Sequence, residues 1–338
     1  MPAPAPAAEH VTLVRVDTAP LRAVEEIMHA GLPQDRPMWH VTLLDDGMDT
    51  HLLFVAHHAL VDGATAVALV GTLLGTGPGG HHLPESPAGR RVRLPLGLLA
   101  GVTGPASATS LLTPIRPGFR LATVSVRLDA VQEAGRRVGA TVNDVVLAAV
   151  ASSIRRLAAS RGESLGRVVI SVPVTGQPSP GARLTRNAVA AFAVSVPDRS
   201  PGQNGNRQLA RLARRTARRK ALVRAFPGTS GFSLLLATLG RLGLYRPMLE
   251  RQRAITTLVT NLRGPEREMT LDGARIVSLT PVSPALGNVC LVFAAVSYAG
   301  QLRISVRMDR SVWRDQELLV TALTTAFEQL VTDSGQHR

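Results

Sequence analysis

The chain has 338 residues, of which 45% are hydrophobic, enough to bury a large core in two domains or half-domains. Its single cysteine, Cys290, excludes an internal disulfide framework and suits a reducing cytoplasm. The net charge of +14 comes almost wholly from arginine and favours anionic or phosphate-bearing partners. With only 3% aromatic residues and no nucleic-acid-binding motif, we expect no nucleic-acid partner.

The first 60 residues predict a short helix and a hairpin. Residues 10–16 alternate crudely and predict an edge strand, and Leu21–His29 predicts an amphipathic helix. Val41–Leu44 and Leu52–Ala56 flank a loop that contains Gly47. This pattern predicts a β-hairpin.

The predicted hairpin ends at two histidines, His57 and His58, and Asp62 and Gly63 then open an apolar helix over Ala64–Leu74. Asp62 is well placed as the N-cap or a first-turn residue of that helix. Adjacent side chains of an extended segment point to opposite sides, so one histidine would face a cleft while the other packs behind it. Because the pKa of histidine lies near neutrality, the first could act as a general base. The other interpretations are two satisfied core histidines or a fragment of a metal site. No second ligand cluster follows, so we predict no metal.

The middle of the chain begins with a connection rich in glycine and proline over residues 75–117. A strand over Val124–Leu128 and a helix over Ala130–Val138 are predicted next. Thr141 and Asp144 have the spacing of a capping box for a helix that ends near residue 159. Asn143 and Asp144 therefore have a sufficient structural role as a helix start.

A basic helix is predicted over residues 207–224, between two strands and an apolar segment. The strands are Val168–Val172, which ends at Pro173, and a run from Asn187 to Val196. Most arginines of the helix fall on one face, which is typical either of a helix lying on an anionic membrane or of an ordinary solvated face. The apolar segment Ser230–Tyr245 is shorter than the ~20 residues that a bilayer span needs.

The C-terminal third is rich in strands. Four are predicted over Ile255–Thr260, Ile276–Leu279, Val289–Val296 and Leu302–Val306, and a helix over Val312–Val331 closes the chain. Since strands and helices interleave throughout, the predicted class is α/β or α+β.

The segment His57–Gly63, HHALVDG, matches the HHxxxDG motif of the CoA-dependent acyltransferase superfamily. Its surroundings resemble the bacterial wax ester synthase/diacylglycerol acyltransferase (WS/DGAT) family. The stretches that carry this likeness occur in family order and are Arg36–Leu44, Thr141–Val146, Thr260–Pro265, Ala274–Arg275 with Pro281–Pro284, and Val296–Gly300.

The resemblance implies two chloramphenicol-acetyltransferase-like halves with a substrate tunnel between them. It implies that His58 is the general base, that His57, Asp62 and Gly63 support it, and that Asp62 turns away from the ligand toward an arginine. Further supporting residues implied by the resemblance are Asn143, Asp144 and Asn261, and tunnel residues are Pro37, Trp39, Asn187, Gly264 and Pro265. Asn187 follows Arg186 where the family has glycine.

The expected organisation is a disordered tail (1–8), a partial N-terminal half (9–75), a linker (76–117) and a C-terminal half (118–335). The likeness begins near residue 10, so we expect an N-terminally short member. The resemblance implies transfer of a fatty acyl group from acyl-CoA to diacylglycerol or a fatty alcohol, with no cofactor beyond this co-substrate. The alternatives are a condensation-type enzyme of a natural-product pathway and a non-catalytic CoA- or lipid-binding remnant. We expect a cytoplasmic protein that contacts anionic membrane or lipid droplets peripherally.

Overall fold

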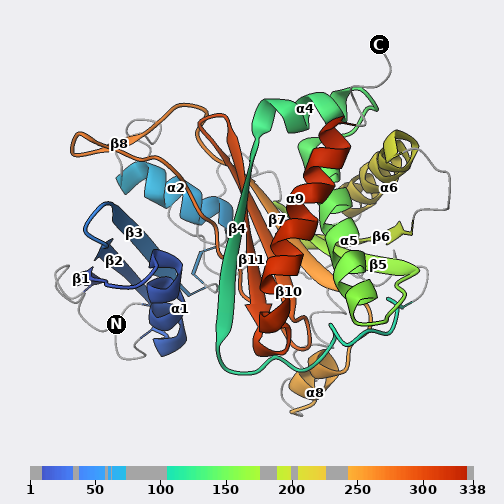
Figure 1. Ribbon diagram of the computed structural model, residues 1–338, viewed down its shortest axis with the longest axis horizontal. Coiled ribbons are helices and arrows are strands. Elements are labelled where there is room, and N and C mark those ends of the chain that lie inside the picture. Colours follow the sequence, from blue (N-terminus) through green and yellow to red (C-terminus); the bar gives the residue numbers. More distant parts are fainter. Residues whose placement is uncertain are drawn as a thin grey trace.

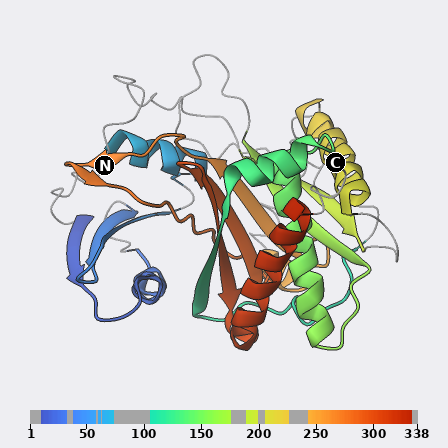
Figure 2. The same ribbon diagram turned by 45° about the horizontal axis from the view of Figure 1, so that its top comes forward.

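The computed structural model describes residues 10–32, 38–57, 60–61, 63–73, 105–175, 189–198, 205–225 and 243–332. Within these residues the N-terminal part forms a three-stranded sheet, and the rest forms a six-stranded sheet and a two-stranded ribbon. The small sheet and the first helix lie on one side of the long first strand of the large sheet, and the C-terminal helix lies on the other (Figures 1 and 2).

The small sheet has the order β1-β2-β3. Its strands are β1 (Val11–Arg15), β2 (Trp39–Asp45) and β3 (Thr50–Ala56), and it is accompanied by α1 (Pro20–Ala30) and α2 (Gly63–Leu73). The predicted hairpin is confirmed as the antiparallel pair of β2 and β3, and β1 is an edge strand that runs parallel to β2. The hairpin loop turns at Gly47, whose φ of 85° favours glycine.

The large sheet has the order β4-β11-β10-β7-β5-β6. Its strands are β4 (Phe119–Arg127), β5 (Arg167–Thr175), β6 (Val189–Pro197), β7 (Thr257–Arg263), β10 (Leu291–Tyr298) and β11 (Gln301–Asp309). Strand β7 runs parallel to β10 and β5, and the other neighbours are antiparallel. The ribbon consists of β8 (Thr270–Leu271) and β9 (Ala274–Arg275).

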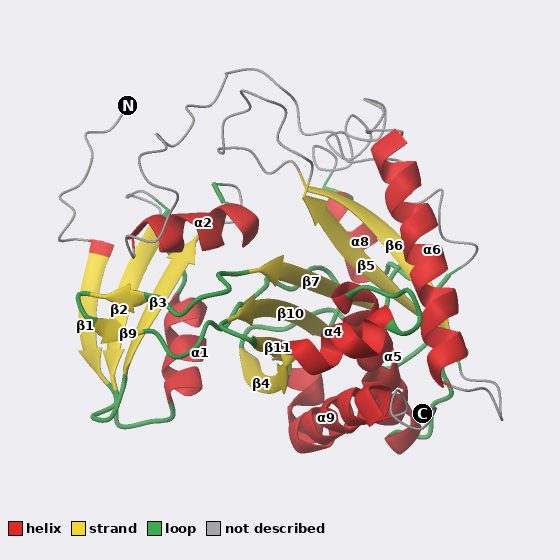
Figure 3. Ribbon diagram, turned by 90° about the horizontal axis from the view of Figure 1, so that it is seen from above, coloured by secondary structure: helices red, strands yellow, loops and turns green. Residues whose placement is uncertain are grey.

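Helices cover one face of the large sheet (Figure 3). They are α4 (Leu128–Arg136), α5 (Val142–Ser160), α6 (Gly205–Ala225) and α9 (Gln316–Thr332), the last preceded by the 3-10 helix η2 (Arg310–Asp315), while α8 (Tyr245–Glu250) precedes β7. The core between helices and sheet contains fully buried side chains such as Ile154, Leu157, Phe293 and Phe327. This mixed architecture confirms the predicted α/β class.

The predicted capping box starts α5. The hydroxyl of Thr141 accepts from the N–H of Asp144, and the Asp144 carboxylate accepts from the N–H of Thr141 (2.9 Å). Asp144 also accepts a hydrogen bond from the Thr216 hydroxyl of α6. One buried carboxylate thus caps α5 and joins it to α6.

Two sequence predictions about strands were wrong. Strand β5 does not end at Pro173 but continues to Thr175, because Pro173 lies beyond the ladder to β7 and interrupts no bond with that strand. Residues Ile276–Leu279 do not form a strand, since they belong to an extended segment without ladder partners.

Some predictions fall on residues that the structure does not describe. The tail 1–8, most of the linker 76–117 and most of the apolar segment Ser230–Tyr245 lie outside the described residues, so the domain boundaries stay predictions. In the described part of the chain, no helix is long and apolar enough to cross a membrane.

Candidate active site

The hairpin holds His57 at the end of β3, where it lines a large cavity. The N–H of His57 donates to the carbonyl oxygen of Met38 (2.8 Å), which extends the β2–β3 ladder by one residue. Its own carbonyl oxygen accepts from the N–H of Leu60 (2.8 Å). The backbone is therefore fixed on both sides of the point where the chain leaves the strand and turns toward α2.

The first residue of α2 brings this turn against the large sheet. A side-chain carbon added at Gly63 would lie 3.1 Å from Cδ1 of Leu262, near the end of β7. Few side-chain carbons in proteins approach so closely, so a larger residue would require the Leu262 side chain to shift by a few tenths of an ångström. The motif of the N-terminal part therefore meets Leu262 of the C-terminal part, and His57, Gly63, Asn261 and Leu262 line the same cavity.

The cavity has a volume of about 2620 Å³ and lies between the small sheet and the helix-free face of the large sheet. Helices α1 and α2, strand β3, strand β7 and residues 276–286 contribute to its walls. Apolar side chains line most of it, for example Val24, Phe54, Val67 and Val296. Because pockets for small ligands are commonly about 300–1,000 Å³, a space of this size suits a long apolar ligand.

One wall of the cavity is the extended segment 276–284, which we call the wall segment. Side chains hold it in place of a backbone ladder. The hydrogen bonds run from Tyr298 Oη to Ile276 O (2.7 Å), from Arg303 Nη1 to Ser278 Oγ and Thr280 Oγ1 (3.1 Å each), and between Thr260 Oγ1 and Ser283 Oγ (3.2 Å). The wall segment therefore depends on individual side chains of β7, β10 and β11.

A buried glutamate joins α1 to the edge of the large sheet. The carboxylate of Glu25 accepts from the N–H of Leu121 on β4 (2.7 Å) and from Arg22 (3.1 Å). Burial raises the pKa of Glu25 above its ordinary value, although the bond from Leu121 and the charge of Arg22 oppose the shift. Glu25 thus satisfies an edge-strand amide and holds one wall of the cavity against β4.

Two sequence models of one family match the chain. The wax ester synthase/diacylglycerol acyltransferase catalytic domain matches residues 19–97, and the WS/DGAT C-terminal domain matches residues 186–331, so together they span well over half of the chain. The chain belongs to the WS/DGAT family. The predicted family is confirmed.

Named relatives of this WS/DGAT chain include mycobacterial proteins. A probable diacylglycerol O-acyltransferase of Mycobacterium tuberculosis is 26% identical over 359 residues, covering 93% of this chain and 76% of the relative. A second M. tuberculosis protein with a diacylglycerol O-acyltransferase name is 26% identical over 376 residues, covering 94% and 73%.

Solved structures show the same fold. The WS/DGAT of Marinobacter aquaeolei VT8 matches with a TM-score of 0.72 at 20% identity, covering 98% of this chain and 82% of that protein. The starter condensation domain of rhizomide synthetase, solved as a mutant with C8-CoA, matches with a TM-score of 0.60 at 15% identity, covering 99% and 79%. The two-half architecture predicted from the sequence is therefore the fold of this WS/DGAT chain.

The structure brings four of the predicted site residues to the cavity: His57, Gly63, Asn261 and Pro265. Four others lie outside the described residues, namely Pro37, His58, Asp62 and Asn187. The role of His58 as base and the arginine partner of Asp62 therefore stay predictions.

Other predicted residues lie away from the cavity. Trp39 stacks on His10 with ring centroids 4.4 Å apart, and Asn143 and Asp144 lie at the start of α5, on the helical side of the large sheet. Gly264 packs against the end of β10, because an added side-chain carbon would lie 2.4 Å from the carbonyl oxygen of Ser297. These placements give Trp39, Asp144 and Gly264 packing or capping contacts, and none of the four lines the cavity.

Two arginines that line the cavity, Arg303 and Arg307 of β11, were not predicted as site residues. A signal was present, because both alternate with the apolar residues Leu302, Ile304 and Val306. Such alternation predicts a strand with one apolar and one polar face. Among the described residues, no group of three histidine, cysteine, aspartate or glutamate side chains is arranged to hold a metal ion.

Proposed function

We propose that this chain transfers a fatty acyl group from acyl-CoA to the hydroxyl group of an acceptor, diacylglycerol or a fatty alcohol. The products would be triacylglycerol or a wax ester, with free CoA. The observation that carries the proposal is the HHxxxDG segment of a WS/DGAT chain, whose residues His57 and Gly63 open into a large apolar cavity. A long acyl chain and a lipid acceptor need such a space.

His58 is the proposed base. Its imidazole removes the proton of the acceptor hydroxyl as the oxygen attacks the thioester carbonyl carbon. The C–S bond of the tetrahedral intermediate then breaks, and the protonated imidazole returns the proton to the thiolate of CoA. No covalent enzyme intermediate is required: the G-x-S-x-G match at Gly162–Gly166 lies on the turn from α5 into β5, not on the strand-to-helix turn of a nucleophile elbow, and Ser164 does not line the cavity.

Neighbouring residues would orient this base and stabilise the intermediate. The backbone of His57, the residue before the proposed base, is held by hydrogen bonds to Met38 and Leu60. Asn261 lines the same cavity beside Leu262, which meets the start of α2, and its amide is our candidate donor to the oxyanion. Asp62 is proposed to fix the turn without touching the ligand.

The decisive assay measures CoA thiol released from palmitoyl-CoA with dioleoylglycerol, with hexadecanol and without an acceptor. We expect acceptor-dependent release that His58→Ala lowers by about 10²–10⁴-fold, the usual contribution of a general base. His40→Ala is the matched control, because His40 of β2 bonds to Thr12 on the neighbouring strand β1 (3.0 Å) and does not line the cavity.

Each outcome of the assay has a consequence. Release that His58→Ala leaves unchanged would refute the role of His58. Activity only with small or carrier-bound acceptors would favour a condensation-type enzyme. CoA binding without any turnover would favour a non-catalytic remnant.

We also propose that α6 meets an anionic membrane, where water-insoluble acceptors are found. Arg207, Arg211, Arg214 and Arg218 are exposed along one side of α6, while Leu209 and Leu212 are buried on the other. Each such charge adds roughly 1 kcal/mol near an anionic surface. The fraction of protein that sediments with phosphatidylglycerol vesicles should be lower for the double variant Arg214→Gln/Arg218→Gln than for the wild type. Equal sedimentation of the two proteins would contradict the proposal.

A further inference from the structure

Strand β11 presents two arginines to the cavity. Arg303 and Arg307 share the cavity face with Ser305, because alternate residues of a strand point to the same side. Arg303 donates to hydroxyl groups of Ser125 and of the wall segment. Among the described residues, neither guanidinium has a carboxylate within 4.0 Å, and the charge of Asp309 acts on Arg307 only from a greater distance.

Arg307 has still fewer contacts. Its guanidinium carbon lies 4.3 Å from the centroid of the Phe119 ring, and within the described residues its side chain makes no hydrogen bond. The carboxylate whose charge acts on Arg307 is that of Asp309, and it already accepts hydrogen bonds from the N–H groups of Arg116 (2.8 Å) and Ser311 (3.0 Å). Burial lowers the pKa of Arg307, and the charge of Asp309 opposes this. Arginine remains protonated at neutral pH all the same.

A second partly buried arginine, Arg155, differs from Arg307 because its guanidinium has protein partners. Arg155 of α5 donates from Nε to the carbonyl oxygen of Leu165 (3.2 Å), donates also to Val196, and lies 3.4 Å from Asp198. A buried cation without partners is costly, which is why buried charges are normally paired. The difference between Arg155 and Arg307 is that Arg307 faces the cavity, where a ligand can supply the missing acceptors.

Arg307 lies toward the opposite end of the cavity from the histidine motif. It pairs with Val292 of β10, which pairs with Leu258 of β7. The motif meets β7 at Leu262, four residues farther along, which is about 13 Å at ~3.3 Å per residue. A ligand can therefore reach Arg307 and the motif at once only if it is long.

We propose that Arg307 is the anchor of an anion-binding subsite that holds the charged group of an acyl-bearing ligand. The group bound there would be an oxyanion that accepts hydrogen bonds from the guanidinium. Two ligands could supply such an oxyanion: acyl-CoA through one of its phosphates, and a fatty acid through its carboxylate. Only the first source rests on the proposed acyltransfer, because a carboxylate would bind here whether or not the chain is catalytic.

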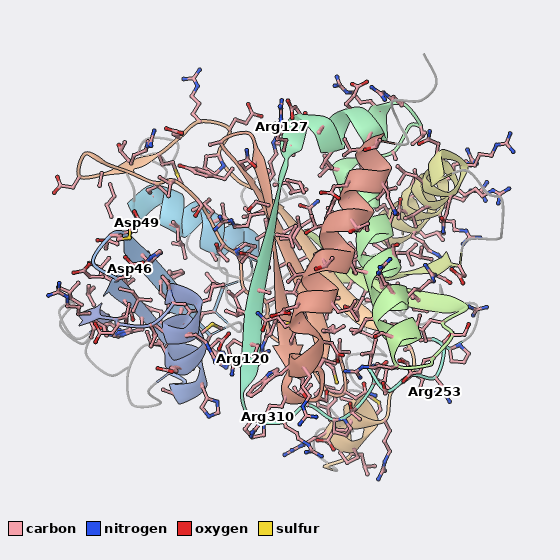
Figure 4. The ribbon with its side chains drawn as sticks, viewed as in Figure 1. Asp46, Asp49, Arg120, Arg127, Arg253 and Arg310 are labelled. Carbon is pink, nitrogen blue, oxygen red and sulfur yellow. The ribbon has the colours of Figure 1, made fainter. Side chains whose placement is uncertain are left out.

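The test is calorimetric binding of CoA, decanoate and decan-1-ol to the full chain and three variants. Arg307→Met keeps the side-chain length and removes the charge, and Arg307→Lys restores the charge. Arg310→Met is the matched control, because Arg310 also stacks on an aromatic ring, Trp313 at 5.2 Å, but is exposed and does not line the cavity. Figure 4 shows Arg310 at the end of β4 and β11 that is farther from Arg127.

We expect Arg307→Met to weaken the binding of CoA or of decanoate by about tenfold or more, which is the usual contribution of a charge-assisted hydrogen bond. The affinity for decan-1-ol should be the same in the wild type and the three variants, and Arg307→Lys should bind the affected anion more tightly than Arg307→Met does. Loss for CoA alone identifies the phosphate, and loss for decanoate alone identifies the carboxylate. Unchanged binding of both anions, an equal loss in Arg310→Met, or no anion binding by the wild type would each overturn the subsite.

Failure of the subsite and failure of the proposed reaction give different results. Arg307-dependent anion binding without thiol release would refute the reaction and keep the subsite. Thiol release with unchanged KM for palmitoyl-CoA and unchanged anion affinity in Arg307→Met would refute the subsite and keep the reaction.

Discussion

The two faces of the six-stranded sheet differ in how their side chains are packed. On the helical face, Phe293, Ile304 and Val306 are fully buried against α5 and α9. On the cavity face, Thr260 of β7 and Arg303 of β11 make hydrogen bonds that hold the wall segment. One face supplies free energy of folding by close packing, whereas the other is organised around an open space. Substitutions on the two faces should therefore change different measurements.

The largest expected difference in stability comes from truncating one side chain on each face. Phe293→Ala should lower the free energy of unfolding by about 3–5 kcal/mol, because it leaves a cavity in a closely packed core. Leu258→Ala, on the cavity face, should cost about 1–2 kcal/mol, since Leu258 already borders open space. Urea unfolding measures both. Equal losses would contradict the distinction between the faces.

A smaller effect is expected for the wall segment. Tyr298→Phe removes both hydrogen bonds of the hydroxyl, the one it donates to Ile276 O (2.7 Å) and the one it accepts from the N–H of Met269 (2.8 Å). The free energy of unfolding should fall by about 1–3 kcal/mol, because two largely buried hydrogen bonds are lost. Tyr245→Phe, at the exposed start of α8, is the control. A Tyr298→Phe protein as stable as the wild type would show that the wall segment does not depend on this hydroxyl.

The smallest effect is a pH dependence at the contact between α1 and β4. The pKa of Glu25 is raised in the folded state, so the folded protein binds the proton more tightly than the unfolded chain. The contribution of protonated Glu25 to the stability of the folded protein is therefore complete below the pKa of Glu25 in the unfolded chain. This contribution is lost as the pH rises through the pKa of Glu25 in the folded protein. Wild type should gain stability relative to Glu25→Gln as the pH falls from 7 toward 5. A difference between the two proteins that is constant with pH would contradict this.

Local signals predicted much of the fold. The capping box of Thr141 and Asp144 and the hairpin before His57 depend on residues a few positions apart, so the sequence shows them directly. The strand at Ile276 failed because β-branched residues do not guarantee a ladder partner. The strand β4 begins at Phe119, five residues before its predicted start, because pairing with β11 overrides local preference.

The candidate site was predictable where a contiguous motif carries it. His57 and Gly63 were found from HHxxxDG, and both line the cavity. The contact between Gly63 and Leu262 joins residues 199 positions apart and has no local signature. The alternation of residues 302–307 places Arg307 on a polar strand face, but only the fold shows that this face of β11 meets the cavity.

The topology of the large sheet also has a consequence for synthesis of the chain. Among the described strands, β4, which ends at Arg127, pairs with β11 alone, and β11 begins at Gln301. At about 5–20 residues per second, β4 leaves the ribosome roughly 10–35 s before its partner exists. During that interval its backbone groups have no strand to pair with, which is the state most open to aggregation. Slow translation of the segment between these strands should therefore lower the soluble yield, and chaperones that shield unpaired strands should restore it.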